Sequence, residues 1–266
     1  MAADFPHLMS PFKIGARTTR NRVLVTGHIP GLEEAGYANA DFIAYHARRS
    51  QGGAGLQMTG TSGFHHTGHA NSGRGIDLTR PGVEEGLQQL ADAVHEHDGT
   101  FLIQLGHSAA TVDYSDIGRP LWAPSPVASQ VLKIMPRQMT RSDIAELVAA
   151  YGAGAAKVRS AGLDGVEILG AFGYLPGAFF SPASNLRSDD YGGSVQNRVR
   201  FALEAAASVR AAVGPDLIVG MRIAGDEKMP GGLDNEDMAE IATLLSEAGS
   251  LDYLNIVAGT NYDRIM

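Results

Sequence analysis

The sequence predicts an α/β fold built on a parallel β-sheet. Short apolar segments rich in β-branched residues alternate with longer segments whose apolar residues recur at helical spacing. The strand segments are almost entirely apolar, as expected for a parallel sheet that is covered on both sides. Two architectures fit this alternation, an open doubly wound sheet and a closed (β/α)8 barrel, and periodicity alone does not separate them.

The predicted elements follow one another regularly along the chain. Residues 11–22 predict a small hairpin, and six strands are predicted over residues 23–26, 55–58, 100–105, 166–169, 217–222 and 253–257. Helices are predicted between the strands over residues 41–52, 81–94, 140–158, 194–203 and 235–249. Thr140 or Ser142 is placed to cap the third helix, and Ser194 the fourth. The proline-rich segment 109–139 is expected to lie over one end of the sheet.

Composition excludes several classes of function. The 266 residues carry a formal charge of −8 with no basic block, so no nucleic-acid partner is expected. The absence of cysteine excludes disulfides, thiolate metal sites and cysteine-held iron–sulfur clusters within these residues. Neither a signal peptide nor an apolar run of membrane-spanning length is present, so we expect a cytoplasmic protein with no membrane partner.

The stretch from Asp164 to Phe201 is the most informative part of the chain. It begins as a predicted strand, VEIL, and breaks at Gly170 and Gly173 into a long loop that ends where the Ser194 helix begins. Loops at the carboxyl ends of parallel strands are where side chains converge on a ligand. Tyr174 lies a few residues past such an end and is therefore a candidate for the site.

Two strings in this stretch, GVEILGAFGYL and SPASNLRSDDYGGSVQNRVRF, resemble the signature of the FMN-dependent old yellow enzyme family, the NADH:flavin oxidoreductases. The greatest likeness is to the branch that holds 2,4-dienoyl-CoA reductases and trimethylamine dehydrogenase. The resemblance implies a (β/α)8 TIM barrel that binds FMN and takes electrons from NAD(P)H.

The number of strands departs from that expectation. A closed barrel has eight strand–helix units, and only about six are found. We therefore expect residues 1–266 to be one FMN-binding barrel domain, truncated after about the sixth strand, with the C-terminal part of the barrel missing. In this branch an iron–sulfur cluster and FAD can follow in residues beyond Met266.

The resemblance also assigns the cofactor contacts. Thr26 and Gly27 match positions that line the isoalloxazine ring, Thr61 matches a position at the ring edge, and Gln104 matches the glutamine bonded to the pyrimidine. Arg222 matches the arginine beside N1 and the ribityl chain. A guanidinium there stabilises the charge of reduced flavin, and an amide offers both a donor and an acceptor. The ordinary alternatives are an ion pair of Arg222 with a neighbouring acid such as Glu167, and a satisfied structural amide.

The resemblance also implies that Tyr174 donates a proton to a carbon atom of the substrate. A phenol with a pKa near 10 is protonated at neutral pH; the alternative is an aromatic ring that only packs in the loop. Leu169 and Phe172 replace the hydrogen-bonding pair by which many family members hold a substrate oxygen, and they are expected to line the substrate pocket. His28 and His107 follow strand ends and are expected there too, with solvated loop histidines as the alternative.

Two groups of polar residues are not expected to carry chemistry. His65, His66 and His69 have no acidic partner at a fixed spacing, so no metal site is predicted. The charged residues of 185–198 alternate in sign, which is typical of a loop held by its own ion pairs.

These observations together predict an FMN-dependent NAD(P)H oxidoreductase that reduces an activated C=C bond in a small molecule, such as an enoyl or dienoyl thioester. An N-methyl amine dehydrogenase or demethylase of the same fold is the first alternative. A flavin-free barrel fragment that serves as a scaffold is the second. A homo-oligomer is compatible with each of the three.

Overall fold

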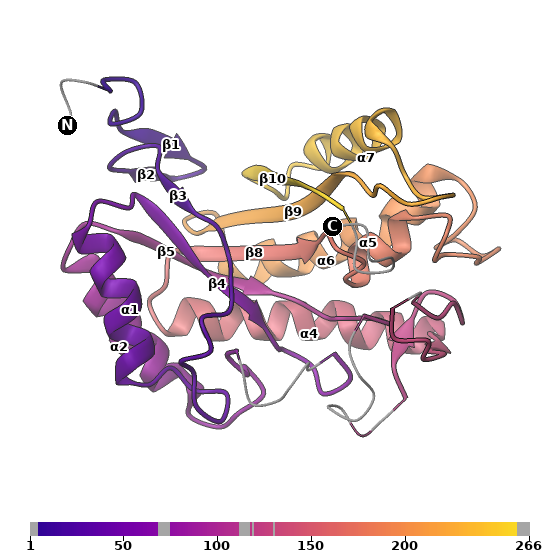
Figure 1. Ribbon diagram of the computed structural model, residues 1–266, viewed down its shortest axis with the longest axis horizontal. Coiled ribbons are helices and arrows are strands. Elements are labelled where there is room, and N and C mark those ends of the chain that lie inside the picture. The colour runs from indigo at the N-terminus through magenta and orange to yellow at the C-terminus, as the bar shows by residue number, and fades with distance from the viewer. Residues whose placement is uncertain (1–4, 69–74, 112–117, 119, 130, 260–266) are drawn as a thin grey trace.

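The chain forms a six-stranded parallel sheet whose spatial order follows the sequence (Figure 1). A computed structural model describes residues 5–68, 75–111, 118, 120–129 and 131–259. The strands in order are β3 (Leu24–Val25), β4 (Leu56–Ser62), β5 (Thr100–Leu105), β8 (Gly165–Gly170), β9 (Ile218–Asp226) and β10 (Tyr253–Ala258). A doubly wound sheet would reverse its strand order at a switch point. This sheet does not reverse, so the doubly wound alternative is excluded and the strands are arranged as in part of a barrel.

Alternating side chains of each strand face two different environments. On β5, Phe101 and Ile103 pack into the large core, to which the long helices contribute their apolar faces. Leu102 points to the opposite face, where it packs with Leu56 and Met58 in a smaller cluster. The helices are α1 (Ala40–Gln51), α2 (Val83–His95), α4 (Arg141–Ser160), α6 (Val195–Val213) and α7 (Asn235–Glu247).

Local capping interactions fix where two of these helices begin. The Thr140 side chain accepts a hydrogen bond from the backbone of Asp143, whose carboxylate accepts one from the backbone of Thr140 in return, a complete capping box. Thr140 and not Ser142 is therefore the cap. Ser194 accepts from the backbone N–H of Asn197, as predicted. The predicted hairpin is also present, as β1 (Phe12–Ile14) paired with β2 (Arg17–Thr19).

Two segments depart from the predicted elements. The loop after β8 contains a short helix, α5 (Leu175–Phe180), with proline in its first turn. Six residues are too few to show helical periodicity in a sequence, so this helix was not predicted. Within the proline-rich segment, β6 (Trp122–Ala123) pairs with β7 (Arg137–Gln138). None of the described helices combines the length and the apolar character needed to cross a membrane.

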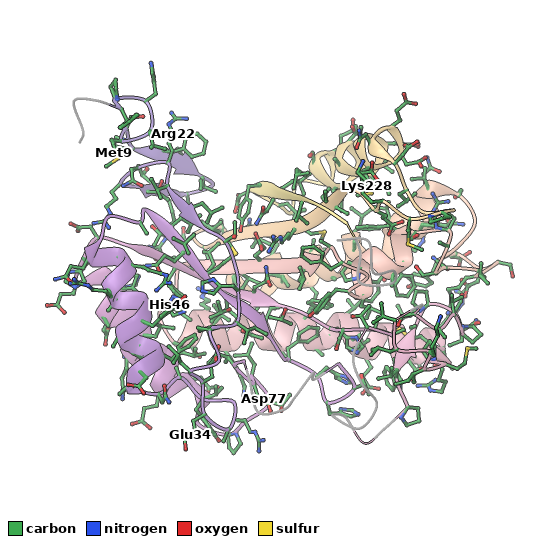
Figure 2. The ribbon with its side chains drawn as sticks, in the orientation of Figure 1. Met9, Arg22, Glu34, His46, Asp77 and Lys228 are labelled. Carbon is green, nitrogen blue, oxygen red and sulfur yellow. The ribbon has the colours of Figure 1, made fainter. Side chains whose placement is uncertain are left out.

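His46, labelled in Figure 2, is a titratable residue on the buried face of α1. Its ring packs edge-on against Phe42 and Phe101, and its Nδ1 lies 3.4 Å from Oε1 of Gln57. No partner for Nε2 is found among the described residues. Burial disfavours the charged ring and lowers the pKa of His46 to about 4, while the Gln57 hydrogen bond opposes the shift.

This burial predicts a pH dependence of stability. The unfolded chain protonates His46 near pH 6.5, whereas the folded chain resists protonation until about pH 4. The unfolded state binds more protons in between, so stability falls as the pH falls through that window, by about 2 kcal/mol for His46 between pH 6.5 and pH 5. Urea unfolding at pH 7 and pH 5 should show a smaller loss in His46→Leu than in the unchanged protein. The exposed His7→Leu serves as the control; an equal loss in all three proteins would contradict the prediction.

Candidate active site

A pocket opens at the carboxyl ends of five neighbouring strands. Side chains from β3 through β9 converge there because parallel strands present these ends at one edge of the sheet. Of the predicted site residues, all but Thr26 and His107 line this pocket. Its lining residues are Gly27, His28, Ile29, Gly60, Thr61, Gln104, Leu169, Phe172, Tyr174 and Arg222.

An irregularity in β4 places Thr61 at the pocket. The pairing of β4 with β5 shifts register between Met58 and Thr61, so that Thr61 stands opposite Gln104. The Thr59 hydroxyl accepts a hydrogen bond from the Gln104 backbone N–H at 3.0 Å and holds the shifted segment in place. Irregularities of this kind re-aim a side chain next to a site. Thr61 Oγ1 thereby comes within 3.5 Å of the Tyr174 hydroxyl.

Gln104 is oriented by a buried carboxylate on the next strand. Its Nε2 donates to Oε1 of Glu167 at 2.7 Å. The other oxygen, Oε2, accepts from the Tyr253 hydroxyl at 2.9 Å and from Asn255 Nδ2 at 3.0 Å. Burial raises the pKa of Glu167 and the three hydrogen bonds oppose that shift. With one amide hydrogen committed, Gln104 still has an oxygen acceptor and a second hydrogen to offer a ligand.

Arg222 brings a positive charge to the pocket without an ion-pair partner there. No ion pair with Glu167 is found among the described residues, although the two charges act on each other. Its Nη1 lies 3.5 Å from the carbonyl of Gly27, and its Nε is buried with no hydrogen-bond partner in the described part of the chain. A buried, unsatisfied guanidinium nitrogen is costly, so this group is suited to an anionic or acceptor-rich ligand.

The aromatic ring of Phe172 packs against the Arg222 guanidinium. The guanidinium carbon of Arg222 lies 5.2 Å from the centre of the Phe172 ring, a cation–π geometry. Phe172 has a φ of 58°, a left-handed backbone conformation that bulky residues rarely adopt. The ring contact with Arg222 gives Phe172 a role at the position where the resemblance leads one to expect a polar group, although the backbone conformation there disfavours a bulky residue.

Tyr174 is held as a neutral phenol. It is the N-cap residue of α5, and its side chain makes no capping hydrogen bond. Burial raises the pKa of Tyr174, partly opposed by the hydrogen bond from Thr61. Because the Thr61 hydroxyl donates to the phenol oxygen, the proton of the phenol is left for another acceptor.

The polar groups of the pocket fit a flavin ring. The pyrimidine end of a flavin alternates donors and acceptors, and the oxygen and remaining N–H of Gln104 match that pattern. The unsatisfied Arg222 Nε supplies a fixed positive donor. Residues 7–259 match the family model of the NADH:flavin oxidoreductase / NADH oxidase family. The chain belongs to this family.

Individual family members resemble most of the chain. A metal reductase from Desulforamulus reducens is 36% identical over 97% of this chain. A multifunctional alkene reductase/demethylase from Caballeronia cordobensis is 33% identical over 95% of it. The chain spans only 38% and 37% of these two proteins. A 2-naphthoyl-CoA reductase in complex with 2-naphthoyl-CoA matches with a TM-score of 0.92 at 26% identity, over 97% of this chain and 41% of that one.

The predicted family is thus confirmed, and the likeness to a CoA-thioester reductase fits the predicted branch. Two predicted site residues, Thr26 and His107, do not line the pocket, whereas His28 does. Thr26 is exposed, and its carbonyl lies 3.2 Å from Nδ1 of His28. His28 lies at the pocket mouth, where Nε2 contacts the Tyr45 hydroxyl. His107 is fully buried, and its Nε2 bonds Thr67 Oγ1 at 3.0 Å, so in this family member it is neither a pocket residue nor a solvated loop residue.

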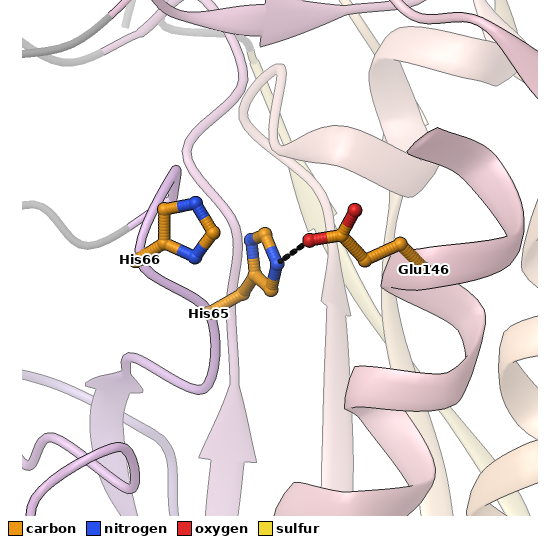
Figure 3. Close-up of side chains that lie close together, drawn as sticks. All are labelled: His65, His66 and Glu146. Carbon is orange, nitrogen blue, oxygen red and sulfur yellow. Dashed lines mark hydrogen bonds and ion pairs between the residues drawn. The ribbon is translucent and has the colours of Figure 1, made fainter. Parts of the chain in front are cut away.

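The histidine pair acquires an acidic neighbour in the structure. His65 Nε2 lies 2.9 Å from Oε1 of Glu146 on α4, and His66 lies beside them (Figure 3). The two bonded residues are 81 positions apart in the sequence, so no local spacing could have revealed the contact. His69 lies outside the described residues.

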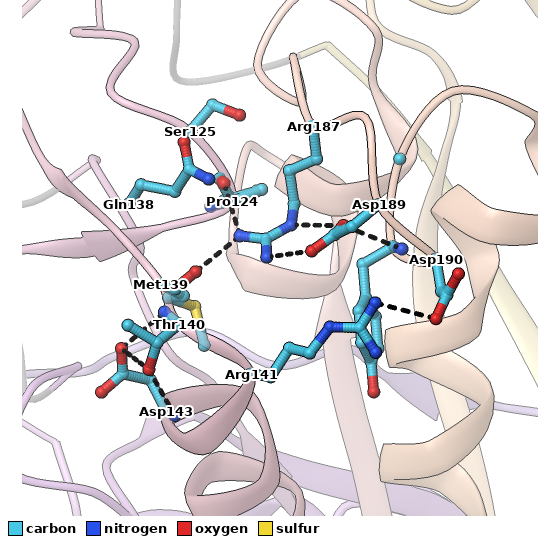
Figure 4. Close-up of polar contacts among 12 residues, drawn as sticks. Pro124, Ser125, Gln138, Met139, Thr140, Arg141, Asp143, Arg187, Asp189 and Asp190 are labelled. Carbon is cyan, nitrogen blue, oxygen red and sulfur yellow. Dashed lines mark hydrogen bonds and ion pairs between the residues drawn. The ribbon is translucent and has the colours of Figure 1, made fainter.

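The polar part of the signature is structural, as predicted. Arg187 is buried and donates two hydrogen bonds to the Asp189 carboxylate, at 2.9 and 2.6 Å. It also donates to the carbonyls of Pro124 and Met139 at 3.1 and 2.6 Å (Figure 4). One guanidinium therefore joins the loop after β8 to the middle and to the C-terminal end of the proline-rich segment.

The Glu167 network predicts a graded loss of stability. Glu167→Ala removes the acceptor of three donors and leaves buried polar groups unpaired, so we expect it to lower the free energy of unfolding by about 3 kcal/mol or more. Glu167→Gln keeps an oxygen acceptor and the same shape and should lose less than half as much. Urea unfolding of both variants at pH 7 measures this order; equal losses would show that the network does not carry the stability.

Proposed function

We propose that this protein is an FMN-dependent oxidoreductase that passes a hydride from NAD(P)H, through the flavin, to an activated C=C bond of an enoyl or dienoyl thioester. The observation that carries the proposal is the meeting of Tyr174, Gln104 and Arg222 in one pocket. These groups are a protonated acid, a neutral amide and a fixed cation. Reduction of a C=C bond needs one hydride and one proton, and Tyr174 has the proton.

The residues of the pocket would have different roles in the reaction. FMN, when bound, supplies the two-electron relay between nicotinamide and substrate. Arg222 and Gln104 would hold the flavin through its acceptor-rich edge, and the guanidinium would favour the anionic reduced form. Tyr174 would donate its proton to the substrate carbon that becomes basic, and Thr61, donating to the phenol oxygen, would stabilise the tyrosinate left behind.

The apolar side chains of Leu169 and Phe172 limit the class of substrate that the pocket suits. Leu169 and Phe172 cannot donate a hydrogen bond to a substrate oxygen, and missing donors at a developing oxyanion cost about 3 kcal/mol of transition-state stabilisation. A thioester is a stronger electron-withdrawing group than a simple ester and has an apolar arm to lie against these side chains. His28, at the pocket mouth, would donate to its carbonyl only if Nε2 left the Tyr45 hydroxyl that it contacts.

We further propose that the sheet is the larger part of a (β/α)8 barrel, with residues 1–266 as the FMN-binding domain. The strand order supports this, because each successive strand of the six is added at the same edge of the sheet, as in a barrel. The remaining strands, and the iron–sulfur cluster and FAD expected in this branch, would then lie outside the 266 residues.

An N-methyl amine dehydrogenase or demethylase is the second candidate. Oxidation of an N-methyl carbon releases a hydride and develops no oxyanion, so it needs no donor at positions 169 and 172. The apolar side chains there therefore suit it, and one relative is named an alkene reductase/demethylase. Formaldehyde released from a methylated amine, with no turnover of an unsaturated thioester, would favour this candidate.

The role of Tyr174 predicts a selective kinetic defect. Tyr174→Phe should leave flavin reduction by NAD(P)H unchanged and slow flavin reoxidation by an unsaturated thioester by about 10²-fold or more, because only the second step consumes the proton. Stopped-flow absorbance of the full-length protein separates the two steps.

Tyr151→Phe is the matched control. The Tyr151 hydroxyl is buried beside Phe64 and Phe201 and has no hydrogen-bond partner among the described residues, so its removal should leave both steps intact. Equal reoxidation rates for the two variants would contradict the assignment of Tyr174. A colourless full-length protein that takes up no FMN would instead favour the flavin-free scaffold.

A further inference from the structure

We propose that His65, His66 and Glu146 form a binding site for a divalent transition-metal ion of the Zn²⁺ class, separate from the flavin pocket. None of the three lines that pocket. One ligand atom from each residue lies within 4.8 Å of the other two. Two imidazoles and one carboxylate are a ligand set that zinc accepts in proteins, with further positions open to water.

The separation of two of these atoms already fits a shared ion. His65 Nε2 and Glu146 Oε1 are 2.9 Å apart. Two ligands that each bind one ion at about 2.1 Å, at nearly a right angle, stand about 3 Å from each other. His66 is exposed, and one of its ring nitrogens lies within 4.8 Å of the other two ligand atoms. Figure 3 shows the His65 ring between the His66 ring and the Glu146 carboxylate, so the His66 ring would have to turn past His65 to reach a shared ion.

A second layer of contacts orients the central ligand. His65 is buried, and its Nδ1 lies 2.8 Å from Thr67 Oγ1, which in turn lies 3.0 Å from Nε2 of His107. With a metal on Nε2, Nδ1 of His65 would carry the proton and donate a hydrogen bond to Thr67 Oγ1, and the 3.4 Å hydrogen bond that Nδ1 accepts from the Thr67 backbone N–H would be given up. Ligand histidines in metalloproteins are held in this way by a hydrogen bond from the second ring nitrogen.

The surroundings allow an ion to enter from solvent. Glu146 is half exposed, with 50% of its side chain accessible. The Trp122 ring lies 5.6 Å from His65 and 6.4 Å from His66, and forms an apolar side to the site. The nearby cation, Arg137, stacks on Trp122 and donates to Asp143 at 2.7 Å, so it is bonded away from Glu146.

The ligand types favour some metals over others. Imidazole nitrogens bind Zn²⁺, Ni²⁺ and Cu²⁺, whereas Mg²⁺ prefers an all-oxygen shell. The site should therefore take up Zn²⁺ in the presence of excess Mg²⁺. A histidine–carboxylate hydrogen bond with no metal function would show no such preference.

The test uses the full-length protein and ZnCl₂ as the probe. Isothermal titration with excess MgCl₂ present should show one Zn²⁺ per chain that is weakened on the order of tenfold or more in both His66→Gln and Glu146→Gln. These two side chains are exposed, so their replacement should leave the fold intact. Trp122 lies beside His65 and provides a second readout, because a Zn²⁺-dependent change in emission that is lost in Trp122→Phe can be assigned to Trp122 in the full-length protein.

Two exposed residues remote from the site provide matched controls, His7→Gln and Glu240→Gln. Both should bind the same ion with unchanged affinity. The proposal is overturned if all four variants bind Zn²⁺ equally, if Mg²⁺ competes on equal terms, or if Zn²⁺ leaves Trp122 emission unchanged at saturation. Flavin content is measured alongside and should not differ among the variants, which separates this site from the proposed oxidoreductase function.

Discussion

A single buried carboxylate organises the interior of the sheet. Glu167 on β8 accepts hydrogen bonds from Gln104 on β5 and from Tyr253 and Asn255 on β10. Burying a carboxylate is unfavourable unless its oxygens are bonded, and here three donors from two other strands offset that cost. The same bonds that stabilise the carboxylate fix the relative position of strands on both sides of it, and with them the edge at which the pocket forms.

The same strands contribute side chains to the core and to the pocket, because successive side chains of a strand point to opposite faces of the sheet. Ile103 and Leu105 of β5 face the helices, while Gln104 between them faces the ligand side. A shift of β5 by one residue would turn its apolar side chains out of the core, so the packing of the core fixes which residues reach the pocket. The site is therefore as rigid as the sheet, which is what a ring-binding site needs.

The sequence was sufficient where a structural signal is local or where a long motif is shared with a family. Strand runs, the hairpin and the caps at Thr140 and Ser194 depend on neighbouring residues, and the resemblance to the family led to Gln104 and Tyr174. The sequence was insufficient where a feature depends on contacts between residues that are far apart in the chain. The irregularity of β4 arises from its pairing with β5, and the contact of His65 with Glu146 requires the docking of α4.

Arg222 keeps its donors for a ligand because other residues supply the hydrogen bonds to Glu167. Had the carboxylate bonded the guanidinium directly, the two charges would neutralise each other and the arginine donors would be lost to a ligand. Neutral donors bond Glu167 instead, and Phe172, in its strained turn, receives the positive charge on its ring face. The pocket therefore keeps a cation whose Nε has no hydrogen-bond partner among the described residues, and that unsatisfied group is the strongest physical reason to expect an acceptor-rich ring beside it.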